Sequence, residues 1–291
     1  MKRYPIIIKS SNAEIAVYFE KRSWLKKFLK SDFLKAYIPA CEIISYQKGR
    51  CQFNFLAKKG IDGLVINSKN AIYSSNKYRD EDIVTLIEFI LEKIRQRNGE
   101  YCMHSSTVII NGRGIVIWGG ATSMGKTCLA LVLSKTKGAI FYSDEKTLIN
   151  LKKNSIVGGV NSIYVSKQYL REKYGNINFH NIENIETWRN REFPISFMVY
   201  PYLEIKKSSS VEIEKWSAEK FNWHLYEELS RKIRGTSRRI FNNSLPVLSI
   251  DDLSIAMTRS LEVKRYTSKI NCYYMRGNGS SLSKNILKIL G

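Results

Sequence analysis

Alternating apolar residues predict strands in the first part of the chain. The runs 4–8 and 14–19 have the spacing of strands, with a Ser-Ser-Asn turn between them. The runs 43–46 and 51–56 flank Gln-Lys-Gly-Arg, which predicts a hairpin. A further strand pair is predicted over residues 64–66 and 71–73.

A helical stripe follows these strands. Apolar residues recur at intervals of three or four over residues 83–94, and Asp80 stands where a helix N-cap is expected. An Arg-Asn-Gly sequence at 97–99 then predicts the end of the helix. We therefore divide the chain into an N-terminal α+β module, residues 1–100, and a second module, residues 101–291.

The second module opens with a hairpin signature. The apolar runs 108–110 and 115–118 are separated by a turn beginning Asn111-Gly112, a pair that suits the positive φ angles of a tight turn. In many nucleotide-binding proteins the strand before the phosphate loop has parallel neighbours instead. A hairpin at this place therefore predicts a mixed sheet.

The second strand of this hairpin leads into the strongest chemical signal. Residues 120–127 read G-x-x-x-x-G-K-T between an apolar run and a helix-forming segment, as in a phosphate-binding loop. Glycines let backbone amides approach an anion, the lysine adds a charge beside the β- and γ-phosphates, and the threonine offers a hydroxyl to Mg²⁺. Most chance matches would lack the flanking strand and helix. The predicted loop residues are Gly120, Ala121, Thr122, Ser123, Met124, Gly125, Lys126 and Thr127.

Two carboxylates follow the next apolar run. Asp144 and Glu145 come shortly after residues 139–142. Side chains at the end of a strand beside the loop can converge on a triphosphate, where they hold Mg²⁺ or take a proton from an attacking hydroxyl. The alternative is an acidic turn with no chemical role.

The densest basic cluster of the chain lies within residues 231–239. It is either the solvated end of a helix, which we favour, or a contact for phosphate or the acceptor, with Arg234 and Arg238 as the candidates. Farther on, the runs 263–266 and 272–275 have the composition of closing strands.

Composition and charge narrow the class of protein. Of the 291 residues, 44% are hydrophobic and 25% are charged, as in a globular protein, and no apolar run reaches the ~18 residues of a membrane helix. The five cysteines include no C-x-x-C pair, so we expect free thiols in a reducing cytosol and no structural zinc site. The net charge of +21 permits anionic partners such as RNA, but the lysines are dispersed and a general bias in composition explains them better.

Together the motifs resemble a known family. His104-Ser-Ser-Thr-Val, the Asn-Gly-Arg-Gly hairpin, the phosphate loop and Ser-Asp-Glu-Lys at 143–146 occur in the order and spacing seen in the kinase module of HPr kinase/phosphorylase. That group shares its nucleotide-binding core with phosphoenolpyruvate carboxykinase. The resemblance covers residues 103–151 well and does not extend to residues 1–100. It implies an α/β fold with a P-loop core of this type.

The resemblance also implies roles for the matching residues. Residues 120–127 would bind the phosphates of ATP, with Thr127 on Mg²⁺. Asp144 and Glu145 would supply a metal ligand and a general base, in either order, and His104 would lie beside them.

This chain departs from the family pattern at two positions. Ser123 replaces the middle glycine of the loop, and Glu145 replaces the second aspartate of the acidic pair. The downstream signature linked to phosphorolysis is not found either, so kinase activity alone is implied.

We therefore expect a cytoplasmic kinase that uses ATP and Mg²⁺ to phosphorylate a hydroxyl, most simply a serine of a protein, a peptide or a small molecule. Lys126 would stabilise the transferring group. One alternative is a nucleotide-dependent RNA-binding protein or RNA kinase; another is a non-catalytic ATP sensor silenced by Ser123 and Glu145. Relatives often form rings, which leaves a homo-oligomer open, and no membrane partner is expected.

Overall fold

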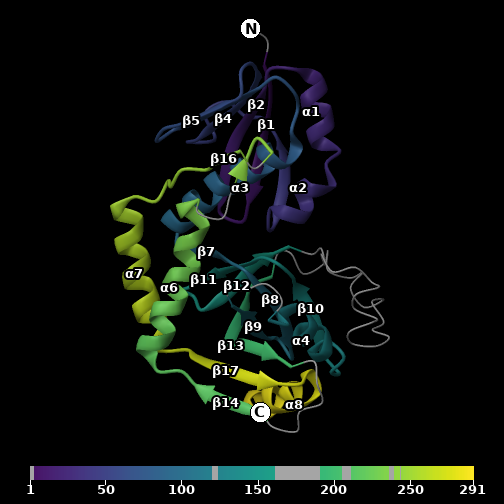
Figure 1. Cartoon of the computed structure of the whole chain (residues 1–291), viewed down its shortest axis with the longest axis vertical. Helices are drawn as coiled ribbons and strands as arrows, with labels where there is room; N and C mark the ends of the chain where they lie inside the picture. Colours follow the sequence, from purple (N-terminus) through teal and green to yellow (C-terminus); the bar gives the residue numbers. More distant parts are fainter. Residues whose placement is uncertain (1–2, 120–123, 161–190, 205–210, 236–238, 243) are drawn as a thin grey trace. The chain divides into compact units, whose positions relative to one another are not determined.

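The computed structural model describes residues 3–119, 124–160, 191–204, 211–235, 239–242 and 244–291 (Figure 1). The fold is mixed α/β, and the chain divides into a first unit, Met1–Glu100 with Ser230–Ile255, and a second unit, Tyr101–Leu229 with Ala256–Gly291. The sequence-based division placed residues 230–255 in the second module. They belong to the first unit because Ile240, Phe241 and Val247 are buried in its core.

A six-stranded sheet with the order β3-β1-β2-β4-β6-β5 forms the first unit. The predicted antiparallel pairs β1–β2 and β5–β6 are confirmed. The strands are β1 (Tyr4–Ser10), β2 (Ala13–Phe19), β3 (Cys41–Ser45), β4 (Asn54–Lys59), β5 (Gly63–Ile66) and β6 (Asn70–Ser75).

The predicted hairpin between β3 and β4 is wrong. β3 pairs with β1, and β4 runs parallel to β2 and β6. An apolar run identifies a strand, whereas its partner depends on where its apolar face is buried. Phe55 and Ala57 of β4 are buried in the core of this unit, and β4 takes its place in the sheet between β2 and β6.

Helices α1 (Arg22–Leu29), α2 (Asp32–Tyr37) and α3 (Asp80–Arg97) complete this core, together with the short pair β15 (Arg239–Ile240) and β16 (Leu245–Pro246). The predicted extent of α3 is confirmed, but Asp80 is not its N-cap. The N-cap is Arg79, and the Asp80 carboxylate instead accepts a hydrogen bond from the Tyr78 hydroxyl at 2.5 Å. The first turn still contains acidic residues, and their negative charges interact favourably with the positive end of the helix dipole.

Buried charged residues of α3 contact one another and the end of β1. The fully buried Arg95 guanidinium lies 2.9 Å from both Glu88 and Glu92, and donates to the Ser10 hydroxyl at 2.6 Å. Removing the cation would leave two carboxylates in the core, which is costly because buried charge needs a partner.

The second unit is built on a larger mixed sheet with the order β10-β8-β9-β13-β12-β11-β7, in which β17 also pairs with β13, and β14 with β17. The predicted hairpin β8–β9 is confirmed, with positive φ at Asn111 (49°) and Gly112 (76°). On its other side β9 runs parallel to β13. The strands are β7 (Glu100–Met103), β8 (Ser105–Ile110), β9 (Arg113–Trp118), β10 (Ala139–Ser143), β11 (Thr147–Asn150), β12 (Ser155–Gly159), β13 (Phe193–Leu203), β14 (Glu212–Lys215) and β17 (Asn271–Gly277).

Two separate apolar clusters fill this unit, one on each face of β9. Ile117 lies in the cluster with residues of α4 (Lys126–Leu133) and α8 (Gly279–Leu290). Its neighbour Trp118 lies in the cluster with residues of α6 (Ala218–Arg234) and α7 (Leu253–Thr267). Successive strand residues thus serve opposite helix layers.

The predicted strand at 263–266 is wrong, because these residues belong to α7. Ile255, Arg259, Val263 and Tyr266 are buried at helical spacing, which outweighs the strand-like composition of the run. The predicted strand at 272–275 is confirmed as part of β17. Among the described residues, no helix has the length and apolar character needed to cross a membrane.

Candidate active site

The phosphate-loop motif lies between a strand and a helix. β9 ends at Trp118 and α4 begins at Lys126, directly after Gly125. Gly125 has φ of 91°, and a Cβ there would lie 2.3 Å from Cβ of Leu203 on β13. Only glycine fits this position, so the end of the loop packs closely against the end of the neighbouring parallel strand.

Of the predicted loop, Met124, Gly125, Lys126 and Thr127 are described, and Gly120, Ala121, Thr122 and Ser123 lie outside the described residues. The Met124 carbonyl accepts a hydrogen bond from the Leu203 amide at 3.1 Å. Lys126 is 7% exposed, and its ammonium donates to the Gly119 carbonyl at 3.3 Å. The lysine therefore reaches back along the loop to the end of β9.

Asp144 meets the first turn of α4. Its Oδ1 accepts hydrogen bonds from the Thr127 hydroxyl at 2.9 Å and from the Ser106 hydroxyl of β8 at 2.5 Å. Its Oδ2 is buried and accepts no hydrogen bond from the described residues. A buried acceptor of this kind, next to a hydroxyl, suits a divalent cation with oxygen ligands.

The environment of Asp144 disfavours its charge. Burial raises the pKa of this carboxyl above its ordinary value, although hydrogen bonds from Ser106, Thr127 and the Glu145 backbone amide and the charge of Lys126 act in the opposite direction. The protein groups therefore offset only part of the cost of burying the negative charge, and a bound cation would offset more of it.

Glu145, the next residue, contacts His104. Its φ of 62° and the hydrogen bond from the Lys146 amide to the Asp144 carbonyl, at 2.6 Å, form a tight turn. The Glu145 side chain is 39% exposed, with Oε2 3.4 Å from Nδ1 of His104. The same His104 nitrogen lies 3.0 Å from the Glu145 carbonyl, which can only accept, so Nδ1 carries the hydrogen.

Helix α6 adds a carboxylate that sequence reasoning missed. Glu228 is 4% exposed, and its Oε1 accepts a hydrogen bond from the His104 amide at 2.9 Å. A signal was present, since Glu228 falls on the buried stripe of Phe221, Leu225 and Leu229. Ser106 was missed as a partner of Asp144 for a different reason, because nothing in the sequence pairs a strand residue with a distant turn.

The predicted residues thus form two contacts in the second unit: Lys126, Thr127 and Asp144 at the loop, and His104 with Glu145 beside it. Arg234 lies in the first unit, with Nε 4.0 Å from the Asp251 carboxylate. Arg238 lies outside the described residues.

No protein-family model and no curated protein matches this chain.

Proposed function

We propose that this chain is an ATP- and Mg²⁺-dependent kinase of the HPr-kinase type that phosphorylates a hydroxyl, most simply a serine. The observation that carries the proposal is the contact between the buried Asp144 and the half-buried Thr127, the first-turn threonine of a G-K-T motif. A carboxylate against this hydroxyl is the arrangement expected of a site for a nucleotide-bound cation.

Each residue then has a task in binding or orienting the reactants. Loop amides and Lys126 hold the β- and γ-phosphates and stabilise the negative charge of the transferring group. Thr127 and Asp144 hold Mg²⁺, which neutralises charge on the phosphate oxygens when bound. The Glu145 carboxylate, which is 39% exposed and lies 3.4 Å from His104, would take up the proton of the acceptor hydroxyl.

The bonds and the proton of the transfer are accounted for by ATP, the acceptor hydroxyl and Glu145. The acceptor oxygen forms a bond to the γ-phosphorus as the bond to the β–γ bridging oxygen breaks, and ADP leaves. The hydroxyl proton passes to the Glu145 carboxylate. Asp144, buried and bonded to two hydroxyls, is a ligand rather than a base.

The test is incubation of the full chain with γ-labelled ATP, Mg²⁺ and a lysate split into protein, RNA and small-molecule fractions. We expect label in the protein or small-molecule fraction, its loss with Lys126→Ala, and its retention with Lys135→Ala, an exposed lysine just after the same helix. Label in RNA would favour an RNA kinase. ATP binding without transfer would favour a sensor, and either result contradicts the proposal.

A further inference from the structure

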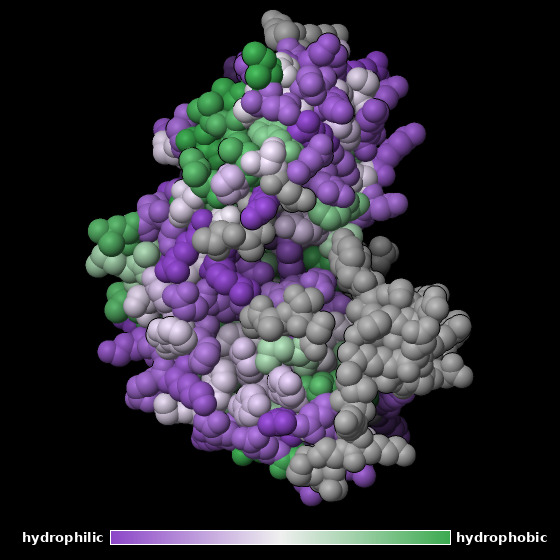
Figure 2. All heavy atoms as spheres, in the orientation of Figure 1, coloured by the Kyte–Doolittle hydropathy of each residue, from purple (hydrophilic) through white to green (hydrophobic). Residues whose placement is uncertain are grey.

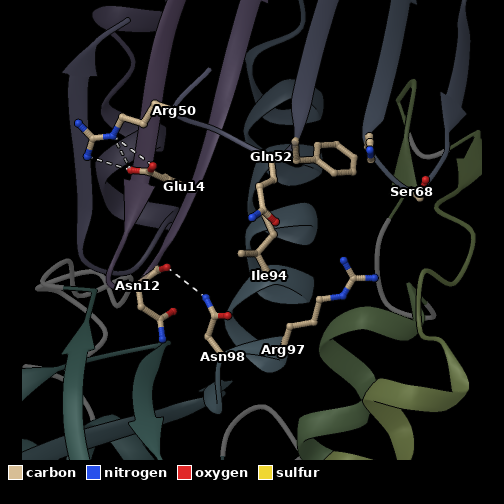
Figure 3. Close-up of a pocket in the computed structure, with 10 residues that line it drawn as sticks. Asn12, Glu14, Arg50, Gln52, Ser68, Ile94, Arg97 and Asn98 are labelled. Carbon is tan, nitrogen blue, oxygen red and sulfur yellow. Dashed lines mark hydrogen bonds and ion pairs between the residues drawn. The ribbon is translucent and has the colours of Figure 1, made fainter. Parts of the chain in front are cut away.

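A polar cavity opens in the first unit, where the parallel strands β2, β4 and β6 begin and α3 ends (Figure 3). Its volume of about 720 Å³ is in the usual range of ligand pockets. The side-chain amides of Asn12, Gln52 and Asn98 line it beside the apolar side chains of Phe53 and Ile94. The Asn98 amide already donates to the Asn12 carbonyl at 3.2 Å, so the side-chain amides of Asn12 and Gln52 are the groups proposed to bond the backbone of a bound chain.

Cations outnumber anions around this cavity. Arg50 is neutralised, because its Nε donates to both oxygens of Glu14 at 3.1 and 3.0 Å. Arg97 and Lys93 lie 3.2 Å from the same oxygen of Asp252, so one carboxylate serves both. Lys69 forms no ion pair with the residues that the structure describes. The cavity therefore attracts carboxylates.

The edge strand of the sheet, β5, ends beside this cavity. The turn Ser68–Lys69, which lines the cavity, joins β5 to β6, and β5 is the last strand of its sheet in the described part of the chain. The Asn67 amide donates a hydrogen bond to the Asn70 carbonyl. In an antiparallel ladder, hydrogen-bonded and non-hydrogen-bonded residue pairs alternate. The pair Val65–Ile72, two positions farther along, is therefore hydrogen-bonded. The backbone groups of Leu64 and Ile66 consequently point away from β6, toward the free edge.

The β5 edge is also apolar. Val65 is 62% exposed and Ile61, just before the strand, is 92% exposed. Figure 2 shows an apolar patch on this unit where Figure 1 places β5. Exposed apolar edge strands pair readily with other chains unless a partner covers them.

We propose that the first unit binds an extended acidic segment of a partner polypeptide, which adds a strand to β5 and places its carboxylates beside Lys69 and Arg97. The proposal goes beyond the kinase function and does not depend on it. A free small acid would fill the cavity without using the β5 edge. RNA would need exposed rings for stacking, and Phe53, the one aromatic residue among the described residues that line the cavity, is 7% exposed.

The test uses a fluorescein-labelled peptide of alternating glutamate and valine and the full chain with Lys126→Ala, so that the phosphate site plays no part. By fluorescence anisotropy, Lys69→Glu should raise Kd at least tenfold. Lys26→Glu, the same charge change on the exposed face of α1, should change Kd less than twofold. Hydrogen exchange of the Leu64 and Ile66 amides should slow on binding, while that of Val65 stays unchanged.

Four outcomes would overturn the proposal. The glutamine version of the peptide could bind equally well, or both charge variants could weaken binding alike, which would show general attraction to a basic protein. Free glutarate could compete as well as the peptide at equal carboxylate concentration, which would assign the cavity to a small acid. Exchange at Leu64 and Ile66 could stay unchanged. Lys69→Gln repeats the comparison if Lys69→Glu lowers the Tm.

Discussion

The Thr127 hydroxyl donates to the Asp144 carboxylate at 2.9 Å, and this contact joins the first turn of α4 to the turn after β10. The carboxylate is 1% exposed, and its second oxygen accepts nothing from the described residues. A charge buried with incomplete bonding destabilises the protein that carries it. Sites that bind charged ligands often store such a cost.

We therefore predict that Asp144→Asn stabilises the protein while abolishing phosphate transfer. Because burial places the folded pKa above the unfolded value of 3.8, Asp144 favours the folded state below pH 3.8, and this contribution is lost as pH rises through the folded pKa. At pH 8 in EDTA, asparagine should raise the Tm by about 2 °C, and the difference should shrink toward pH 4. Added Mg²⁺ with ATP should raise the Tm of wild type only.

A second prediction concerns the close approach of Gly125 to Leu203. Alanine at Gly125 would adopt an unfavourable positive φ and bring Cβ within 2.3 Å of the Leu203 side chain. The matched control is Gly112→Ala, at φ +76° with nothing within 4 Å of the added Cβ. Urea unfolding should show a loss of about 1–2 kcal/mol for the control, and about 1–3 kcal/mol more for Gly125→Ala. Equal losses would mean that the loop does not need this contact.

Much of the second unit could be predicted from sequence, because its signals are local. The Asn111-Gly112 turn and the apolar runs around it identify β8 and β9. The strand-end position of Asp144 likewise predicts that it lies near the loop, since strand ends gather at one edge of a sheet.

Other features could not be predicted, because they depend on contacts between distant parts of the chain. The pairing of β3 with β1 and the return of residues 230–255 to the first unit are set by which apolar faces meet. The tight turn at Glu145 depends on its φ of 62°, which its sequence neighbours do not signal. The Glu228 contact with His104 spans 124 positions.

A third prediction tests the buried cation of the first unit. Arg95→Met removes the partner of Glu88 and Glu92, which lie 2.9 Å from the guanidinium in a fully buried cluster. The unfolding free energy should fall by about 3–5 kcal/mol at pH 7, because two buried carboxylates lose the cation that they share. Arg97→Met, on the same helix but with its side chain 49% exposed, should cost less than about 1 kcal/mol. Urea denaturation separates the two, and similar losses would contradict a structural role for the cluster.

The last prediction concerns Glu228, which holds the amide of His104 at 2.9 Å from a buried position on α6. Glu228→Gln keeps an acceptor oxygen for this amide, whereas Glu228→Ala leaves the donor without it, at a cost of about 1–3 kcal/mol. If Glu228 positions His104, and through it Glu145, alanine should lower kcat for phosphate transfer about tenfold with little change in KM for ATP. Glutamine should restore most of that rate.

Glu227→Ala is the neighbouring control, because it removes a carboxylate of the same helix that is more exposed. It should leave kcat and Tm close to wild type. If Glu228 has a purely structural role, its alanine variant should have a lower Tm, but the kcat values of the alanine and glutamine variants should be similar. Equal loss of kcat in both Glu228 variants would instead show that its charge matters, and a positioning role through the His104 amide would be rejected.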